Sequence, residues 1–147
     1  MAYDNTEVPA GRSQENIREL LKKYGIGQVQ YTDCWPEGVS VEFARVEKNA
    51  AGVVEKVIRV RILGKPNLQK KNKPEAERRR VYRVIYWHLK AKLEVVAEGL
   101  VTFEEEFLPH IILPSGATVY DELRSHLPAV FAGTQRLALP AFGGEAK

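Results

Sequence analysis

The sequence predicts an α+β domain in which a three-stranded antiparallel meander is covered on one face by two helices, with a C-terminal helical arm. Three observations predict this fold. Apolar residues recur at helical spacing near residues 14–24 and again over residues 74–98. Between these stretches, three segments alternate apolar with polar residues, and short turn sequences separate them. Such a sheet has one apolar face that needs a cover, and two amphipathic helices supply it.

The first helix is expected over residues 14–24. Ser13 is a suitable cap for its first turn, and Gly25 suits its C-terminal end because glycine accepts left-handed backbone angles. Residues 1–12 are polar and show no periodicity, so we expect a flexible N-terminal arm there.

Three strands are expected, over residues 28–35, 39–46 and 53–63. The third shows the alternation most clearly. Its predicted inward-facing residues are Ile58, Val60 and Ile62. Its predicted outward-facing residues are Val57, Arg59 and Arg61. An antiparallel meander with one solvated face is the simplest arrangement of these strands.

The longest element is a helix expected from Pro74 to about Glu98. Proline is favoured in a first turn, and Gly99 suits the C-terminal end. The predicted apolar stripe of this helix consists of Tyr82, Ile85, Tyr86, Leu89, Leu93 and Val96. Together with the strands and the first helix, it completes a core domain over residues 13–100.

A C-terminal arm is expected over residues 101–132. Thr102 begins a capping box for one short helix, and Thr118 caps a second over residues 119–127, which Pro128 is expected to end. Residues 133–147 are rich in Gly, Ala and Pro, so we expect a flexible tail.

Composition narrows the class of protein. Hydrophobic residues make up 44% of the 147 residues, which suffices for a soluble domain with its own core. Cys34 is the one cysteine, so an intramolecular disulfide and a four-cysteine zinc site are excluded. No apolar run approaches the roughly 18 residues of a membrane helix, and the N-terminus lacks a signal-peptide pattern. We therefore expect no membrane partner and a cytoplasmic location.

Charge is unevenly distributed, although the net charge is only +3. Residues 65–92 carry ten Lys or Arg and two Glu, whereas residues 93–123 carry seven acidic residues and no Lys or Arg. Such blocks indicate two surfaces with different roles, or two surfaces that pair between subunits. We expect a homo-oligomer, because the acidic arm and the apolar tail residues need neighbours.

The basic loop and the polar side of the long helix form the strongest candidate site. At 100° per residue, the side opposite the apolar stripe carries three cations and a tryptophan. Cations neutralise phosphates, and an indole ring stacks on an unpaired base. The predicted nucleic-acid-binding residues are Arg59, Arg61, Lys65, Lys70, Lys71, Lys73, Arg78, Arg79, Arg80, Arg83, Trp87 and Lys90. Tyr82 and Tyr86 are lesser candidates for stacking.

Each of these assignments has a simpler alternative. The long helix could present an ordinary solvated face, with Trp87 covered by the C-terminal arm and the Lys and Arg side chains paired with the acidic residues of 93–123. Arg59 and Arg61 either extend the basic surface or, as we favour, belong to the normal wet face of a sheet.

Catalysis and metal binding have little support in the sequence. The residues Glu104, Glu105, Glu106 and His110 invite a metal site. Consecutive helical residues point in different directions, however, so the three glutamates cannot converge on one ion. Their favourable interaction with the positive N-terminal end of a short helix explains them better. No Ser or Cys lies in a nucleophile motif. We therefore predict no metal, no cofactor and no enzymatic activity.

A family resemblance rests on residues 90–119 and on a leading helix. Residues 17–25 read IRELLKKYG, and the later stretch contains KAKLE, FEEEFL and a PxGxT-like segment. Over about residues 14–120, the chain resembles a group of small, uncharacterised proteins encoded by bacteriophages and mobile elements. This resemblance implies a phage or mobile-element origin, a role in DNA replication or recombination, and the host cytoplasm as location. It assigns no activity and no catalytic residue.

The α-β-β-β-α order is also similar to that of double-stranded-RNA-binding domains. In those domains the second helix opens with a lysine cluster, which KKNKPEAERRR resembles loosely. The long second helix and the C-terminal arm depart from that pattern.

Together these patterns favour a non-catalytic protein that binds nucleic acid, with single-stranded DNA preferred. The first alternative is a phage accessory or inhibitor protein that acts through protein–protein contacts. The second is a metal-dependent nuclease.

Overall fold

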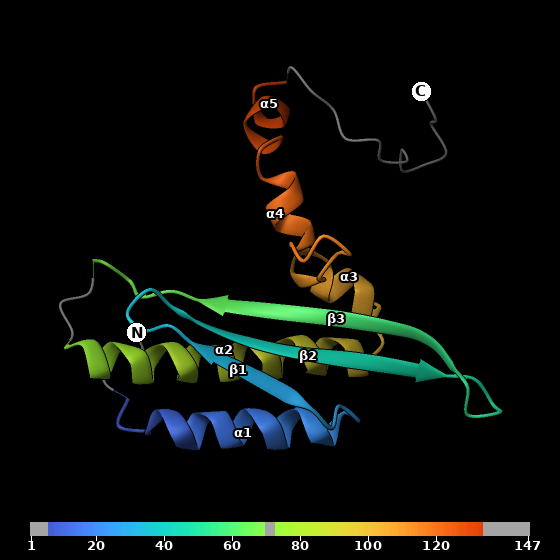
Figure 1. Ribbon diagram of the computed structural model, residues 1–147, viewed down its shortest axis with the longest axis horizontal. Helices are drawn as coiled ribbons and strands as arrows, with labels where there is room; N and C mark the ends of the chain where they lie inside the picture. Colours follow the sequence, from blue (N-terminus) through green and yellow to red (C-terminus); the bar gives the residue numbers. More distant parts are fainter. Residues whose placement is uncertain (1–5, 70–72, 134–147) are drawn as a thin grey trace.

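The computed structural model describes residues 6–69 and 73–133 of the chain. It has an α+β fold with a three-stranded antiparallel sheet in the order β1-β2-β3, helices before and after the sheet, and further helices at the C-terminal end (Figure 1). The predicted fold class is confirmed. The predicted tail over residues 133–147 lies outside the described residues except for Gly133, and residues 1–5 of the predicted N-terminal arm also lie outside them. Residues 10–12 of that arm belong to a helix, which corrects the prediction there.

Helix α1 spans Ala10–Lys23 and begins earlier than the sequence predicts. The Ser13 N–H donates to the Pro9 carbonyl at 3.1 Å, so Ser13 lies in the first turn rather than at its cap. The buried residues Ile17, Leu20 and Leu21 face the rest of the core.

The sheet consists of β1 (Val29–Asp33), β2 (Val39–Lys48) and β3 (Val54–Gly64). Tyr31 lies opposite Val41, and Val41 lies opposite Ile62. The inward positions predicted for the third strand are confirmed, because Ile58, Val60 and Ile62 are all buried. Val57 and Arg59 are exposed and Arg61 is half-buried on the outer face, as predicted.

The strands differ in length, and this shapes the sheet. β1 pairs with Val39–Phe43 only, whereas β2 and β3 continue as a hairpin beyond the start of β1 (Figure 1). Residues Ala44–Lys48 therefore have β3 on one side and no strand of the described chain on the other.

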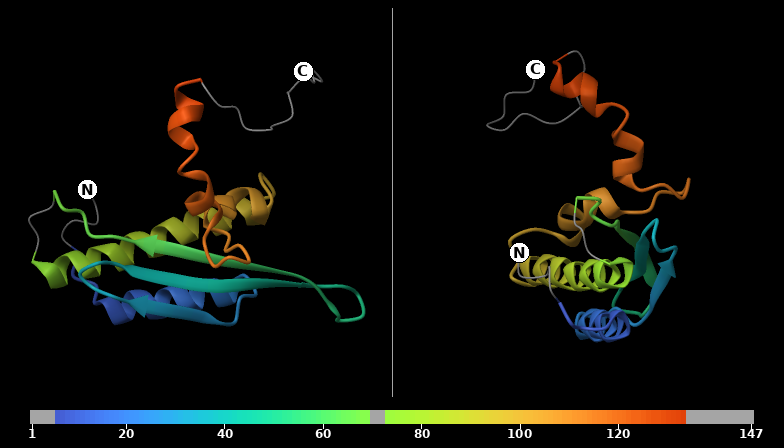
Figure 2. Two further views of the ribbon diagram at one scale, coloured as in Figure 1. Left: turned by 45° about the horizontal axis from the view of Figure 1, so that its top comes forward. Right: turned by 90° about the vertical axis from the view of Figure 1, so that its left-hand side faces the viewer.

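Helix α2 spans Pro74–Ala97, close to the prediction, and lies beside α1 on the inner face of the sheet (Figure 2). The predicted stripe is confirmed: Tyr82, Ile85, Leu89 and Leu93 are buried, and Tyr86 and Val96 pack against the core. A glycine at position 64 permits this packing. A Cβ there would lie 2.6 Å from Val81 Cγ1 and 2.8 Å from Ile85 Cδ1.

Helix α3 (Phe103–Phe107) belongs to the core rather than to an appended arm. Thr102 and Glu105 form the predicted capping box. The rings of Phe103 and Phe107 stack at 4.4 Å, and Phe107 meets Phe43 edge-to-face at 6.0 Å. The predicted division between a core domain ending at residue 100 and an arm starting at residue 101 therefore separates residues that pack together in one core.

The chain then covers the free edge of β3 and extends away from the sheet (Figures 1 and 2). The Ile112 N–H donates to the Arg59 carbonyl at 2.8 Å, after the short 3-10 helix η1 (Leu108–His110). The prediction of a single helix over residues 119–127 is wrong. Two helices form instead, α4 (Val119–Leu123) and α5 (Leu127–Phe131), because Pro128 suits the first turn of α5.

Among the described helices, none is long and apolar enough to cross a membrane.

Candidate nucleic-acid interface

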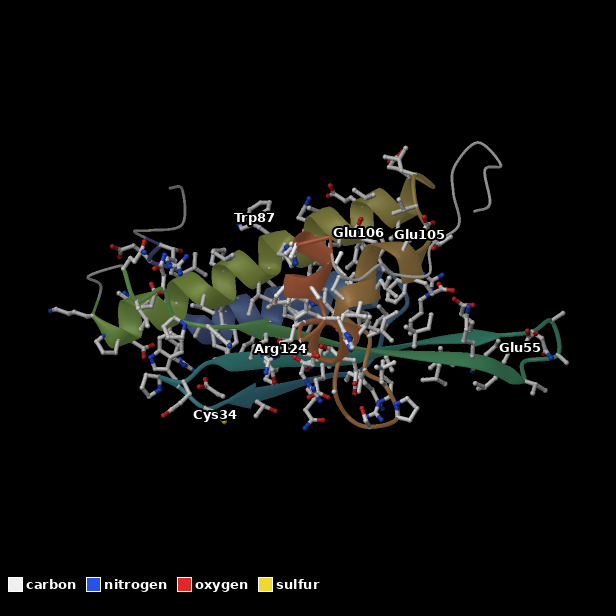
Figure 3. All side chains as sticks on the ribbon, turned by 90° about the horizontal axis from the view of Figure 1, so that it is seen from above. Cys34, Glu55, Trp87, Glu105, Glu106 and Arg124 are labelled. Atoms are coloured by element: carbon white, nitrogen blue, oxygen red, sulfur yellow. The ribbon has the colours of Figure 1, made fainter. Side chains whose placement is uncertain are left out.

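Trp87 lies on the side of α2 that points away from the sheet (Figure 3). Its side chain is 43% exposed, although it belongs to a residue type that is usually well buried. The Tyr86 ring meets it edge-to-face at 5.2 Å, and Lys90 Nζ lies 5.7 Å from its ring centroid. This exposure shows that the described C-terminal helices leave much of the ring uncovered, and α3 contacts α2 about one turn further along, where Lys92 pairs with Glu106.

Arg79 and Arg83 lie one and two turns before Trp87 on the same helix. No hydrogen bond or ion pair joins either guanidinium to another residue in the described ranges. Their Nε atoms are buried without a hydrogen-bond partner. Arg83 Cζ lies 4.9 Å from the centroid of the Tyr86 ring. Arg83 is only 9% exposed, which corrects the prediction that this face is open along its whole length.

Their neighbours Arg78 and Arg80 are held by carboxylates. Arg78 Nε donates to Asp33 Oδ2 at 2.8 Å, and Arg80 Nε donates to Glu77 Oε1 at 2.8 Å. The side chains of Arg80 and Glu77 are only 11% and 6% exposed. Lys90 is likewise paired, with Glu94. Positive charge at these three cations is therefore largely neutralised within the chain.

Asp33 collects three donors where the end of β1 meets α2. Burial raises the pKa of Asp33, but hydrogen bonds from Arg78, the Trp35 N–H and Tyr82 outweigh it, so the pKa is lowered overall. The Tyr82 hydroxyl donates to Asp33 Oδ2 at 3.1 Å, and Tyr82 has no exposed surface. Tyr82 is therefore unable to stack on a base, and that prediction is wrong.

The loop between β3 and α2 adds two exposed cations. Lys65 and Lys73 form no ion pair with any residue that the structure describes. The Asn67 N–H donates to Glu77 Oε2 at 2.6 Å, which fixes the start of the loop to α2. The predicted contacts of Lys70 and Lys71 lie outside the described residues.

Arg59 and Arg61 lie on a different surface. They are on the outer face of the sheet, and α2 packs on the inner face. The favoured interpretation, that they belong to the solvated face of the sheet, is therefore confirmed, and they do not extend the α2 surface. Arg61 Nε donates to Glu42 Oε2 at 3.1 Å, and its Nη1 donates to the Gly116 carbonyl at 3.0 Å. Arg59 is exposed and has no ion pair within the described part of the chain.

The three consecutive glutamates of α3 go to separate partners, as their helical directions predict. Glu104 pairs with Lys56 at 2.7 Å, Glu105 completes the capping box, and Glu106 pairs with Lys92 at 2.9 Å. No group of three or more potential metal ligands occurs among the described residues.

One histidine of α2 and one of η1 are in contact, which the sequence does not reveal. The His88 and His110 rings are 6.0 Å apart. Burial, then the charge of Lys92, lowers the pKa of His110 to about 4. Burial is also the main cause that lowers the pKa of His88.

The alternative that basic residues pair with the acidic block is confirmed in part, by Lys90 with Glu94 and Lys92 with Glu106. Sequence reasoning missed the carboxylates that hold Arg78 and Arg80. The spacing of Glu77 and Arg80, three residues apart on a helix, could have revealed one pair. The contact of Asp33 with Arg78 joins residues 45 positions apart, and no local pattern signals it. No protein-family model, curated protein or solved structure matches the chain.

Proposed function

We propose that the protein binds nucleic acid, with single-stranded DNA preferred, through the exposed side of α2 and the loop before it, without catalysing a reaction. The observation that carries the proposal is the pair of unpaired guanidiniums, Arg79 and Arg83, beside the exposed ring of Trp87.

Unpaired buried donors are unfavourable in the free protein. A buried polar group without a hydrogen-bond partner costs about 1–3 kcal/mol. Like charges four residues apart on a helix add a further penalty of a few tenths of a kcal/mol. The contact of Arg83 with Tyr86 offsets only part of this cost. An anion that accepts hydrogen bonds from both guanidiniums removes it once the Arg83 side chain moves off the Tyr86 ring toward solvent, and a phosphate matches their geometry.

The spacing along α2 suits a strand that runs parallel to the helix. At about 1.5 Å per residue, Arg79, Arg83 and Trp87 follow one another at intervals of about 6 Å. Phosphates would lie on the arginines and on Lys65 and Lys73, and a base would stack on Trp87. A duplex keeps its bases stacked inside, so the exposed indole favours a single strand.

The proposal extends to biological context and assembly. The resemblance of residues 90–119 to proteins of phages and mobile elements supports a role in replication or recombination, and hence a cytoplasmic location. Exposed apolar side chains on the C-terminal helices, such as Phe131 at 80% exposure, support association between copies.

Binding of labelled single-stranded DNA, double-stranded DNA and RNA, measured by fluorescence anisotropy at two salt concentrations, tests the proposal. We expect the single strand to bind best and its affinity to fall steeply with salt. Arg79→Ala should weaken binding roughly tenfold, whereas Arg124→Ala, just after α4 and with the same change of charge, should not.

Two results would exclude the proposal. No affinity for any oligonucleotide would favour a protein–protein module instead. Cleavage of the DNA on addition of Mg²⁺ would favour the metal-dependent nuclease.

A further inference from the structure

Beyond Phe43, one edge of β2 has backbone groups with no strand of residues 6–69 or 73–133 beside them. The Cys34 N–H donates to the Gly38 carbonyl at 3.0 Å, which fixes the alternation of hydrogen bonds between β1 and β2. Even-numbered residues of β2 therefore direct their N–H and C=O groups toward β1, and odd-numbered residues toward β3. β1 pairs no further along β2 than Phe43, so the backbone groups of Val46 point to a side where the described residues place no strand.

Two cavities flank this bare edge. The outer one, of about 680 Å³, is lined by Gln28, Ala44, Val46 and Arg59 among others. The inner one, of about 400 Å³, lies between β2, the end of α1 and the C-terminal part of α2. Gly25 and Val46 line both, so the bare edge lies between them.

The two cavities differ in chemistry. The inner cavity is lined mainly by apolar side chains: Ile26, Leu93, Val96 and Phe103. Its two charged residues, Arg45 and Glu47, pair with each other at 3.5 Å. In the outer cavity, Glu42 is paired with Arg61, whereas Arg59 has no ion pair within the described ranges.

We propose that this edge binds an extended peptide segment of a partner protein, with alternating apolar and acidic residues, which adds a strand beside Val46. Successive side chains of a strand point to opposite faces, so the apolar ones enter the inner cavity and the acidic ones approach Arg59. A bound peptide would also cover part of the apolar cross-strand pair of Val46 and Val57, which are 48% and 51% exposed in the free chain. This surface is separate from the side of α2 that carries Arg79, Arg83 and Trp87, and the inference does not depend on nucleic-acid binding.

The test uses two labelled heptapeptides, in which valine alternates with glutamate or with lysine. Fluorescence anisotropy of the full chain should show the glutamate peptide binding roughly tenfold more tightly than the lysine peptide. Arg59→Glu should reverse that preference. Arg79→Ala should leave peptide binding unchanged.

The backbone contact has its own pair of variants. Val46→Pro removes the N–H on the bare side and leaves the β2–β3 hydrogen bonds, so it should abolish binding. Val46→Thr keeps the N–H and should retain most of it. Circular dichroism is used to check that each variant is folded. If the Val46→Pro protein does not fold, Arg59→Glu still tests the site.

Three outcomes would overturn the proposal. One is equal binding of the two peptides, or none. Another is peptide binding that survives in a folded Val46→Pro protein. The third is a dimer in sedimentation experiments that Val46→Pro dissociates, because a second copy of the chain would then occupy the edge.

Discussion

Four arginines within six positions of α2 have opposite environments. Arg78 and Arg80 each donate to a carboxylate, whereas Arg79 and Arg83 have no carboxylate partner in the described chain. The difference follows from direction, because residues 100° apart on a helix face different neighbours. Asp33 lies at the end of β1 beneath Arg78, and Glu77 precedes Arg80 by one turn.

The comparison shows that a count of basic residues overstates a binding surface. The ten cations of residues 65–92 suggest a continuous basic region. Carboxylates of the chain hold several of them, and the charge left for a ligand lies at Arg79, Arg83 and the exposed lysines of the loop. Substitutions at the paired residues should therefore change stability, and substitutions at the unpaired residues should change binding.

The largest expected effect is on stability, at Glu77. Glu77→Gln removes the charge from a pair in which both side chains are almost buried, so the free energy of unfolding should fall by roughly 3 kcal/mol. Urea denaturation measures this. Glu75→Gln is the matched control, because the Glu75 side chain is 64% exposed and its loss should cost under about 1 kcal/mol. Glu75 also pairs, with Arg78 at 3.4 Å, so equal effects at the two positions would contradict the distinction between a buried and a solvated ion pair.

The next effect is on base stacking. Trp87→Leu should weaken single-stranded DNA binding roughly tenfold, because an aromatic–base stack contributes about 1–3 kcal/mol. Binding to double-stranded DNA should change less. The parent should also show quenching of tryptophan fluorescence on titration with single-stranded DNA, and the variant should lose most of it. Undiminished affinity in Trp87→Leu would exclude the stacking role.

Releasing a paired arginine should add to the binding surface. Asp33→Asn removes the charge of the closer of the two carboxylates that hold Arg78 and leaves only the exposed Glu75, so affinity for single-stranded DNA should rise a few-fold while the unfolding free energy falls by about 1 kcal/mol. The lowered pKa of Asp33 has a matching consequence. Its contribution to stability is present above its ordinary pKa of 3.8 and is lost as pH falls through the lower folded value. Unchanged affinity in Asp33→Asn would show that Arg78 does not reach the ligand.

The smallest expected effect concerns the histidine pair. Because both pKa values are lowered in the folded chain, the unfolded chain binds protons first as pH falls. Stability should therefore decline from pH 6.5 toward about pH 4. Thermal unfolding at pH 7 and pH 5 measures it, and His110→Gln should reduce the difference between the two midpoints. An identical difference in the variant would mean that other groups cause the decline.

Local patterns in the sequence were sufficient for the main elements. The stripe from Tyr82 to Val96 and the alternation around Val60 depend on periodicity alone, and both are confirmed. Contacts between distant segments had no such signal. The docking of Phe107 on Phe43 places α3 in the core, and the reach of Arg78 to Asp33 neutralises part of the basic block.

The burial of Arg83 shows a further limit of periodicity. Its position on the helix predicts exposure, since it lies away from the apolar stripe. Its guanidinium instead lies over the ring of Tyr86, and its Nε is buried. A long side chain that folds along a neighbouring ring is not visible in a pattern of residue types.

The most direct test compares two adjacent arginines with the same change of charge. Single-stranded DNA affinity would be measured for the parent, Arg78→Ala and Arg79→Ala between about 50 and 200 mM salt. The account predicts that Arg79→Ala reduces the slope of log affinity against log salt by about 0.7, the loss of one phosphate contact, and that Arg78→Ala leaves the slope unchanged. Equal slopes in the two variants, or a reduction in Arg78→Ala alone, would contradict it.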